Sequence, residues 1–195
     1  MAPRRLPLHL SYRCALALLP PAAITPPLEA VRRERDNYFA HWPPHINLLY
    51  PFLKSPSNWE PSEPQGDVRA TPPFHVSLIC DQPSVVSHHA SRKTVWLEPT
   101  SRSIHQLQAA LQAEFSECNA DNWRYRPHLS VGEASSDDGA KKLSSEITKS
   151  VSDFLACSAE RPLMLDWYVD KVYVMEREGY YDRFEIVGAI DLGQK

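Results

Sequence analysis

The sequence predicts an α+β fold in which short strands alternate with amphipathic helices. Of the 195 residues, 43% are hydrophobic, which suits one domain of ordinary size or two small lobes that share a cleft. Eighteen prolines against six glycines indicate stiff turns and interrupted strands rather than long helices. The proline-rich connections are not typical of regular parallel crossovers, so we expect antiparallel sheets.

The first quarter of the chain is expected to contain a buried strand, a helix and a second strand. Residues 14–19 form an apolar run that ends at a proline pair, which predicts a central strand. Thr25-Pro26-Pro27 predicts a helix start, because threonine is a common N-cap and proline suits the first turn. The charged run at 32–36 is interpreted as the solvated face of this helix. Residues 1–11 are expected to be flexible.

Further strands and two helices are predicted along the rest of the chain. Residues 54–73 and 81–93 are expected to be loops. Apolar stripes at helical spacing begin at Ile104 and Leu143 and predict two amphipathic helices. The expected strands after Phe52 are residues 74–79, 94–97, 164–169, 171–175, 184–187 and 190–192.

The most informative stretch is His45-Ile46-Asn47-Leu48, which follows two prolines. The prolines make a rigid, extended approach, and the residues after them are predicted to form a strand. Alternate side chains of a strand share a face, so His45 and Asn47 point to one side. The opposite face joins a core, and the first face offers an imidazole and an amide to a polar ligand.

His128-Leu129-Ser130-Val131 repeats this arrangement, again after a proline and 83 residues further along the chain. Two such histidines suit acid–base chemistry at phosphorus. One neutral imidazole accepts a proton from the attacking oxygen, and the other, as imidazolium, gives a proton to the leaving oxygen. Asn47 and Ser130 are candidate donors to the phosphate oxygens.

Two other histidine patterns favour structural interpretations. His75-Val76-Ser77-Leu78 also matches the motif, but it lacks the surrounding pattern and is interpreted as a strand histidine near the surface or the cleft rim. His41 and His45 have the spacing of helical zinc ligands. The prolines between them forbid the helix that this spacing needs, so we expect no metal site there.

The two motifs resemble the paired H-x-[T/S]-x motifs of the 2H phosphoesterase superfamily, and in particular its branch of 2'-5' RNA ligases and RNA 2',3'-cyclic phosphodiesterases. The resemblance implies a single domain over residues 1–195 with a bilobal, pseudo-twofold fold. Two antiparallel-type sheets would flank a central cleft, with helices outside and one histidine from each lobe. Asn47 stands where the family usually has threonine or serine.

The resemblance also implies a function. The protein would be a phosphoesterase without metal or cofactor that opens 2',3'-cyclic phosphate ends of RNA or nucleotides, or joins ends in reverse through a 2'-5' linkage. His45 and His128 would be catalytic, by analogy as acid and base respectively, and Asn47 and Ser130 would bind phosphate. The further cleft candidates are Tyr125, Arg126, Tyr181 and Arg183. The alternative is an RNA-end or nucleotide-binding module with weak turnover or none, which Asn47 and the acidic net charge favour.

The net charge and the cysteine pattern indicate which partners and which cellular compartment to expect. The formal net charge of −3 gives no support to non-specific binding along a nucleic-acid backbone. Four scattered cysteines without a C-x-x-C pattern indicate reduced thiols in an intracellular protein. We expect a cytoplasmic monomer without a membrane span, with the nucleus as the alternative compartment.

Overall fold

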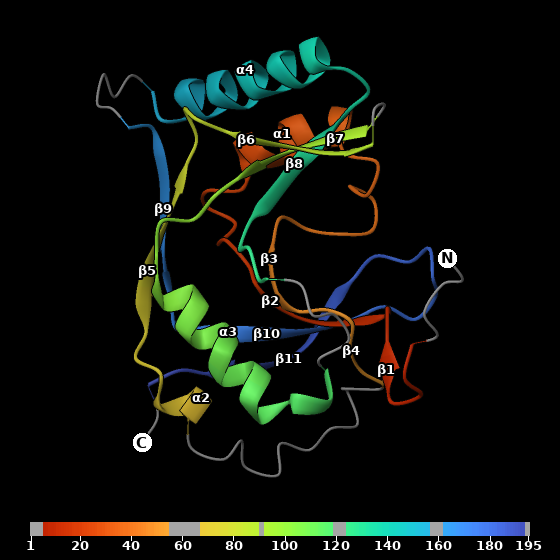
Figure 1. The fold of residues 1–195 in the computed structure, drawn as a ribbon. Helices are drawn as coiled ribbons and strands as arrows, with labels where there is room; N and C mark the ends of the chain where they lie inside the picture. The colour runs from red at the N-terminus through yellow and green to blue at the C-terminus, as the bar shows by residue number, and fades with distance from the viewer. Residues whose placement is uncertain (1–5, 55–66, 90–91, 119–123, 157–161, 194–195) are drawn as a thin grey trace.

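The computed structural model describes residues 6–54, 67–89, 92–118, 124–156 and 162–193, and it has the predicted α+β fold (Figure 1). All strand pairs among these residues are antiparallel, as expected. The largest sheets have four and three strands, and each carries one of the two histidine motifs. Two further strand pairs form small sheets of their own, in addition to the two sheets that were expected. None of the described helices has the length and apolar character that a membrane span requires.

The four-stranded sheet has the order β11-β10-β2-β3. Its second inner strand, β2, is buried along its whole length, as the apolar run predicts. The last two predicted strands form one continuous strand, β11, because the glycine between them pairs within the sheet. The bounds are β2 (Cys14–Leu18), β3 (Ile46–Leu49), β10 (Lys171–Glu176) and β11 (Glu185–Asp191).

The three-stranded sheet has the order β6-β7-β8. Its edge strand β6 (Ser84–His89) lies in the segment expected to be a loop, so that expectation is wrong there. Val85 and Val86 favour extended backbone and pair with the next strand, which outweighs the polar residues around them. The other two strands are β7 (Arg92–Leu97) and β8 (Leu129–Ala134).

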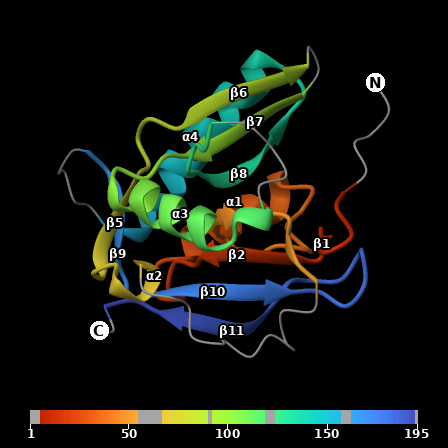
Figure 2. The ribbon, with the colours of Figure 1, turned by 60° about the horizontal axis from the view of Figure 1, so that its bottom comes forward.

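The two sheets are built by similar units, in which a strand, a helix and a second strand follow one another. The helix of each unit lies against the sheet of the other unit (Figures 1 and 2). Helix α1 (Pro26–Arg35) contacts β8 and α4 (Asp137–Phe154), whereas α3 (Ser103–Glu114) contacts β3. This exchange interlocks the two lobes. One cluster of buried apolar side chains runs through both of them, so packing fixes the relative position of the motifs.

The remaining elements join and border the lobes. β5 (Phe74–Ile79) pairs with β9 (Met164–Val169), and the short helix α2 (Asp67–Ala70) lies beside α3. Near the N-terminus, β1 (Leu10–Ser11) pairs with β4 (Phe52–Leu53), and both residues of β1 are buried. The expectation of a flexible segment up to residue 11 is therefore wrong at its end, while residues 1–5 lie outside the described part.

Gly132 of β8 lies where α1 crosses the second motif. A Cβ at this position would lie 2.7 Å from the Arg35 carbonyl oxygen and 2.8 Å from the Arg35 Cβ. The helix end must shift to make room, so we expect Gly132→Ala to lower the free energy of unfolding by about 1–3 kcal/mol. Urea denaturation measures this change. Gly188→Ala is the matched control, because its Cβ would lie 3.7 Å from Val174 in ordinary contact; equal losses in both variants would contradict the prediction.

Candidate active site

His45 is held on two sides at the entrance to β3. Its Nδ1 lies 2.8 Å from the carbonyl oxygen of Pro43, which suits a tautomer whose Nδ1–H donates and whose Nε2 carries the lone pair. The ring of Trp42 stacks on the imidazole at 4.3 Å with an interplanar angle of 17°. Phe184 also stacks on Trp42, with the two ring centroids 3.6 Å apart. The hydrogen bond and the stack together fix the plane of His45 and leave Nε2 for chemistry.

His128 has the same supports at the entrance to β8. Its Nδ1 lies 2.8 Å from the carbonyl oxygen of Arg126, again two residues earlier in the chain. Its ring packs against Trp96 of β7, with centroids 4.3 Å apart. Each motif therefore presents a histidine in the same tautomer beside a tryptophan. The first motif belongs to the four-stranded sheet and the second to the three-stranded sheet.

Both imidazoles are neutral at pH 7 in the unliganded protein. Burial lowers the pKa of His45 to about 4, although the Pro43 carbonyl opposes this shift. The charges of Arg32 and of protonated His128 lower the pKa of His45 further, so the two histidines lie near enough to interact. Burial also lowers the pKa of His128. An anion bound close to both imidazoles would raise both pKa values.

The low pKa of His45 makes the fold sensitive to acid. Between about pH 6.5 and pH 4 the unfolded chain protonates this histidine and the folded chain does not, so stability falls as the pH drops. We expect a loss of up to about 3 kcal/mol from this group. Urea denaturation at pH 7 and pH 4.5 measures it, and His45→Gln should remove this part of the loss. An unchanged loss in the variant would contradict the pKa assignment.

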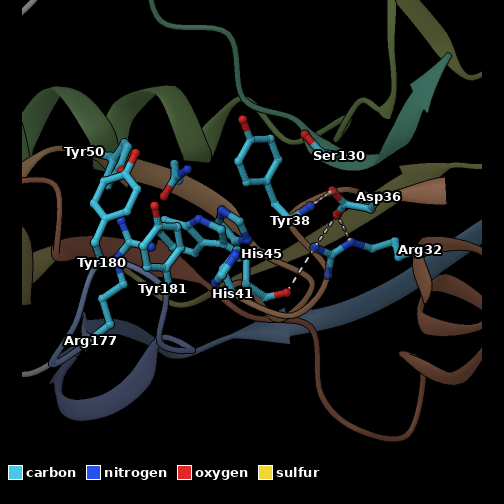
Figure 3. Close-up of a pocket in the computed structure, with 12 residues that line it drawn as sticks. Arg32, Asp36, Tyr38, His41, His45, Tyr50, Ser130, Arg177, Tyr180 and Tyr181 are labelled. Carbon is cyan, nitrogen blue, oxygen red and sulfur yellow. Dashed lines mark hydrogen bonds and ion pairs between the residues drawn. The ribbon is translucent and has the colours of Figure 1, made fainter. Parts of the chain in front are cut away.

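A pocket with a volume of about 460 Å³ lies against His45 (Figure 3). It is bordered by the C-terminal end of α1, the loop that leads to β3, the strands β3 and β8, and the loop after β10. The lining residues are Arg32, Asp36, Tyr38, His41, Trp42, His45, Asn47, Tyr50, Ser130, Arg177, Tyr180 and Tyr181.

Four of the residues expected at the site line this pocket. His45 and Asn47 come from the first motif, Ser130 from the second, and Tyr181 from the loop after β10. The side-chain Oδ1 of Asn47 is buried and has no hydrogen-bond partner among the residues that the structure describes. His128 is not among the lining residues. It lies at the start of the strand that brings Ser130 to the pocket.

The other three candidates have structural contacts instead and do not line the pocket. The Tyr125 hydroxyl donates to the backbone oxygen of Asn47 at 2.9 Å, which ties the two motifs together. Arg126 forms an exposed ion pair with Glu98 at 2.9 Å. Arg183 is exposed and donates to the backbone oxygen of Phe39 at 3.3 Å.

The remaining histidine patterns lie apart from this pocket or lack metal-binding geometry. His75 is exposed on β5 and packs against Tyr168 of β9. His41 lines the pocket through the loop before β3. Within the described ranges, no group of three or more His, Cys, Asp or Glu side chains is placed to hold a metal ion.

Arg32 and Asp36 are site residues that the sequence analysis missed. Arg32 was expected on a solvated face, but it is only 2% exposed and forms an ion pair with Asp36 at 2.6 Å. The signal was present, because Leu28, Val31 and Arg32 are spaced to share one face of α1. All three are buried, so the arginine lies on the apolar face at its pocket end.

Three tyrosines were also missed. Tyr38, Tyr50 and Tyr180 line the pocket from segments far apart in the chain, together with Tyr181 (Figure 3). Arg177 lies among them, with its guanidinium 4.9 Å from the Tyr180 ring and 4.8 Å from the Phe184 ring. No spacing in the sequence relates these residues, because only the tertiary fold brings them together.

Two interlocked units, each with a histidine directly before its motif strand and with both motif strands bordering one pocket, are typical of the class of two-histidine phosphoesterases. Residues 20–180 match the family model of the 2'-5' RNA ligase superfamily, and the chain belongs to this superfamily of 2H phosphoesterases. The family consists of phosphoesterases and ligases of RNA and nucleotides, so the protein belongs to a class of enzymes.

Solved structures show the same fold. One is Escherichia coli LigT, in a crystal structure with 3'-AMP. The match covers 94% of this chain and 99% of the LigT chain, with 18% sequence identity and a TM-score of 0.58. Another is TT0787 of Thermus thermophilus. The match covers 93% of this chain and 98% of the TT0787 chain, with 14% sequence identity and a TM-score of 0.53. At these identities the likeness concerns the fold. No curated protein matches the chain.

Proposed function

We propose that the protein is a metal-independent phosphoesterase that opens 2',3'-cyclic phosphate ends of RNA or nucleotides. The observation that carries this proposal is the repeated setting of His45 and His128, each with Nδ1 anchored to the carbonyl two residues earlier and Nε2 left for proton transfer. A volume of about 460 Å³ is within the range of small-molecule sites and suits a nucleotide.

The two imidazoles divide the proton transfers. Burial lowers the pKa of both histidines, to about 4 for His45, which keeps His45 in the neutral form that accepts a proton. We therefore assign His45 as the base and His128 as the acid, the reverse of the assignment by analogy. His45 takes a proton from the attacking water as its oxygen bonds to phosphorus. His128 donates a proton to the 3'-oxygen as the P–O3' bond breaks, which leaves a 2'-phosphate and a 3'-hydroxyl.

Asn47 and Ser130 bind the phosphate in this mechanism. The Asn47 amide nitrogen and the Ser130 hydroxyl are hydrogen-bond donors on the two motif strands that border the pocket. They stabilise the negative charge that grows on the non-bridging oxygens. With a 5'-hydroxyl in place of water as the attacking group, the same residues would join two ends. The P–O5' bond forms as the P–O3' bond breaks, which leaves a 2'-5' linkage and a 3'-hydroxyl.

The second candidate function is binding of RNA ends without turnover. Asn47 favours it, because its buried, unpartnered Oδ1 occupies the position where the family usually has a hydroxyl. An Asn side chain is longer than threonine, and its oxygen repels a phosphate oxygen.

Binding and conversion of one substrate separate the two functions. A short RNA with a 2',3'-cyclic phosphate end is incubated with the protein in excess chelator, and an RNA with a 3'-hydroxyl end is the control. Conversion to a 2'-phosphate end supports the phosphoesterase. Binding without conversion, with turnover gained in Asn47→Thr, supports the binding module. If the protein does not bind the RNA and does not convert it, both functions are contradicted.

A further inference from the structure

Arg32 is a buried cation, and one nitrogen of its guanidinium lacks a hydrogen-bond partner among the described residues. Its Nε and Nη2 donate to Asp36 Oδ2 at 2.9 and 2.6 Å, and Nη2 also donates to the Trp42 carbonyl oxygen at 3.0 Å. Its Nη1 is buried as well, but within the described part of the chain it has no hydrogen-bond partner. The guanidinium extends from α1 toward His45 at the pocket (Figure 3).

An unpaired donor on a buried charged group is costly. Burying such a group without a partner loses the hydration of its N–H bonds, so native structures usually supply an acceptor from the protein, water or a ligand. Nη1 belongs to a residue that lines the same pocket as His45, Asn47 and Ser130. A group bound in this pocket is therefore a candidate acceptor for Nη1.

Arg177 is the other buried arginine of the pocket, and its surroundings differ. Tyr180 and Phe184 pack against its guanidinium, and its Nη2 donates to the Tyr12 carbonyl oxygen. In Figure 3 it lies on the far side of His45 from Arg32. Its Nε is also buried without a hydrogen-bond partner among the described residues. Arg177 is thus held mainly by two aromatic rings, whereas Arg32 is held by three hydrogen bonds.

We propose that Arg32 binds a non-bridging oxygen of a phosphate through Nη1, while Asp36 and the Trp42 carbonyl hold the guanidinium in place. Guanidinium suits this task because it is always charged and its donors are fixed in a plane. Arg32 would add a cation to the hydrogen-bond donors of the two motifs. The inference rests on the proposed function for the identity of the anion.

Binding of inorganic phosphate tests this role without turnover. Isothermal titration calorimetry compares the native protein with Arg32→Gln, and we expect phosphate to bind roughly tenfold or more weakly to the variant. The matched control is Arg33→Gln, which removes the same charge from the exposed side of the same helix and should change the affinity less than about twofold. Asp36→Asn keeps an acceptor for Arg32 but removes a negative charge, so it should bind phosphate more tightly.

The directions of these changes separate binding from a structural role. If Arg32 only supports the fold, Arg32→Gln and Asp36→Asn both weaken binding. If Arg32→Gln does not fold, the double variant Arg32→Gln/Asp36→Asn, which leaves no unpaired carboxylate, has the same expected loss. Native-like affinity of the Arg32 variant overturns the inference, as does the absence of phosphate binding by the native protein.

Failure of the proposed function gives a different result. If the native protein binds phosphate through Arg32 but does not open cyclic phosphates, the inference stands and the phosphoesterase proposal fails. If it opens cyclic phosphates and Arg32→Gln leaves both phosphate affinity and KM unchanged, the phosphoesterase proposal stands and the inference fails.

Discussion

Replacing either His45 or His128 with alanine is expected to reduce kcat/KM for a nucleoside 2',3'-cyclic phosphate by roughly 100- to 10,000-fold. Each variant removes one of the two proton transfers, while the stacked tryptophan and the motif strand remain. Because both transfers belong to one reaction, the double variant should lose little more activity than either single variant. Steady-state hydrolysis of the cyclic nucleotide measures all three.

His75→Ala is the matched control for this prediction. His75 belongs to a similar H-x-S-x sequence, but it is exposed on β5 and packs against Tyr168 outside the pocket. Its replacement should leave kcat/KM within about twofold of the native value, as expected for a surface position. An active His45→Ala or His128→Ala variant would contradict the two-histidine mechanism, whatever the control shows.

Arg32→Leu should lower the free energy of unfolding by about 3–5 kcal/mol, because it leaves the Asp36 carboxylate buried without its cation. The Asp36 side chain is only 5% exposed, so water cannot replace the lost partner fully. In Arg32→Leu/Asp36→Leu no charge is left behind, and part of the stability should return. Urea denaturation of both variants at pH 7 gives the comparison.

The exposed pair of Lys149 and Asp153 is the control for the buried pair. It has the same i, i+4 spacing on α4, but its side chains are 74% and 64% exposed. Lys149→Leu should therefore leave the stability nearly unchanged, since water screens such a pair. Equal losses in the Lys149 and Arg32 variants would show that burial does not set the strength of the Arg32 pair.

The sequence predicted the elements whose pattern is local. Apolar runs and helical stripes identified β2 and α3, because burial on one face leaves a period that can be counted. Helix α4 begins at Asp137, earlier than the stripe from Leu143 indicated. Its start depends on Ser136, whose side chain accepts from the Gly139 nitrogen, in a polar segment that resembles a turn.

The site was predictable only as far as its motifs. The histidine, asparagine and serine positions follow from strand alternation, and the structure places Asn47 and Ser130 at one pocket. Arg177 and Tyr180 reach that pocket from a loop more than a hundred residues after His45, which no local pattern encodes. Arg32 lies between these two cases. Its position on the apolar stripe of α1 could be read from the sequence, but it belongs to a charged run, and such runs are usually solvated.

The most direct test of the two-histidine phosphoesterase is the fate of a nucleoside 2',3'-cyclic phosphate with the native protein in excess chelator. Phosphorus NMR distinguishes the cyclic phosphate from the 2'- and 3'-monophosphates. We predict that the cyclic signal disappears and that the 2'-phosphate replaces it. An unchanged cyclic signal at high protein concentration, or turnover that stops when the chelator is added, would contradict this function.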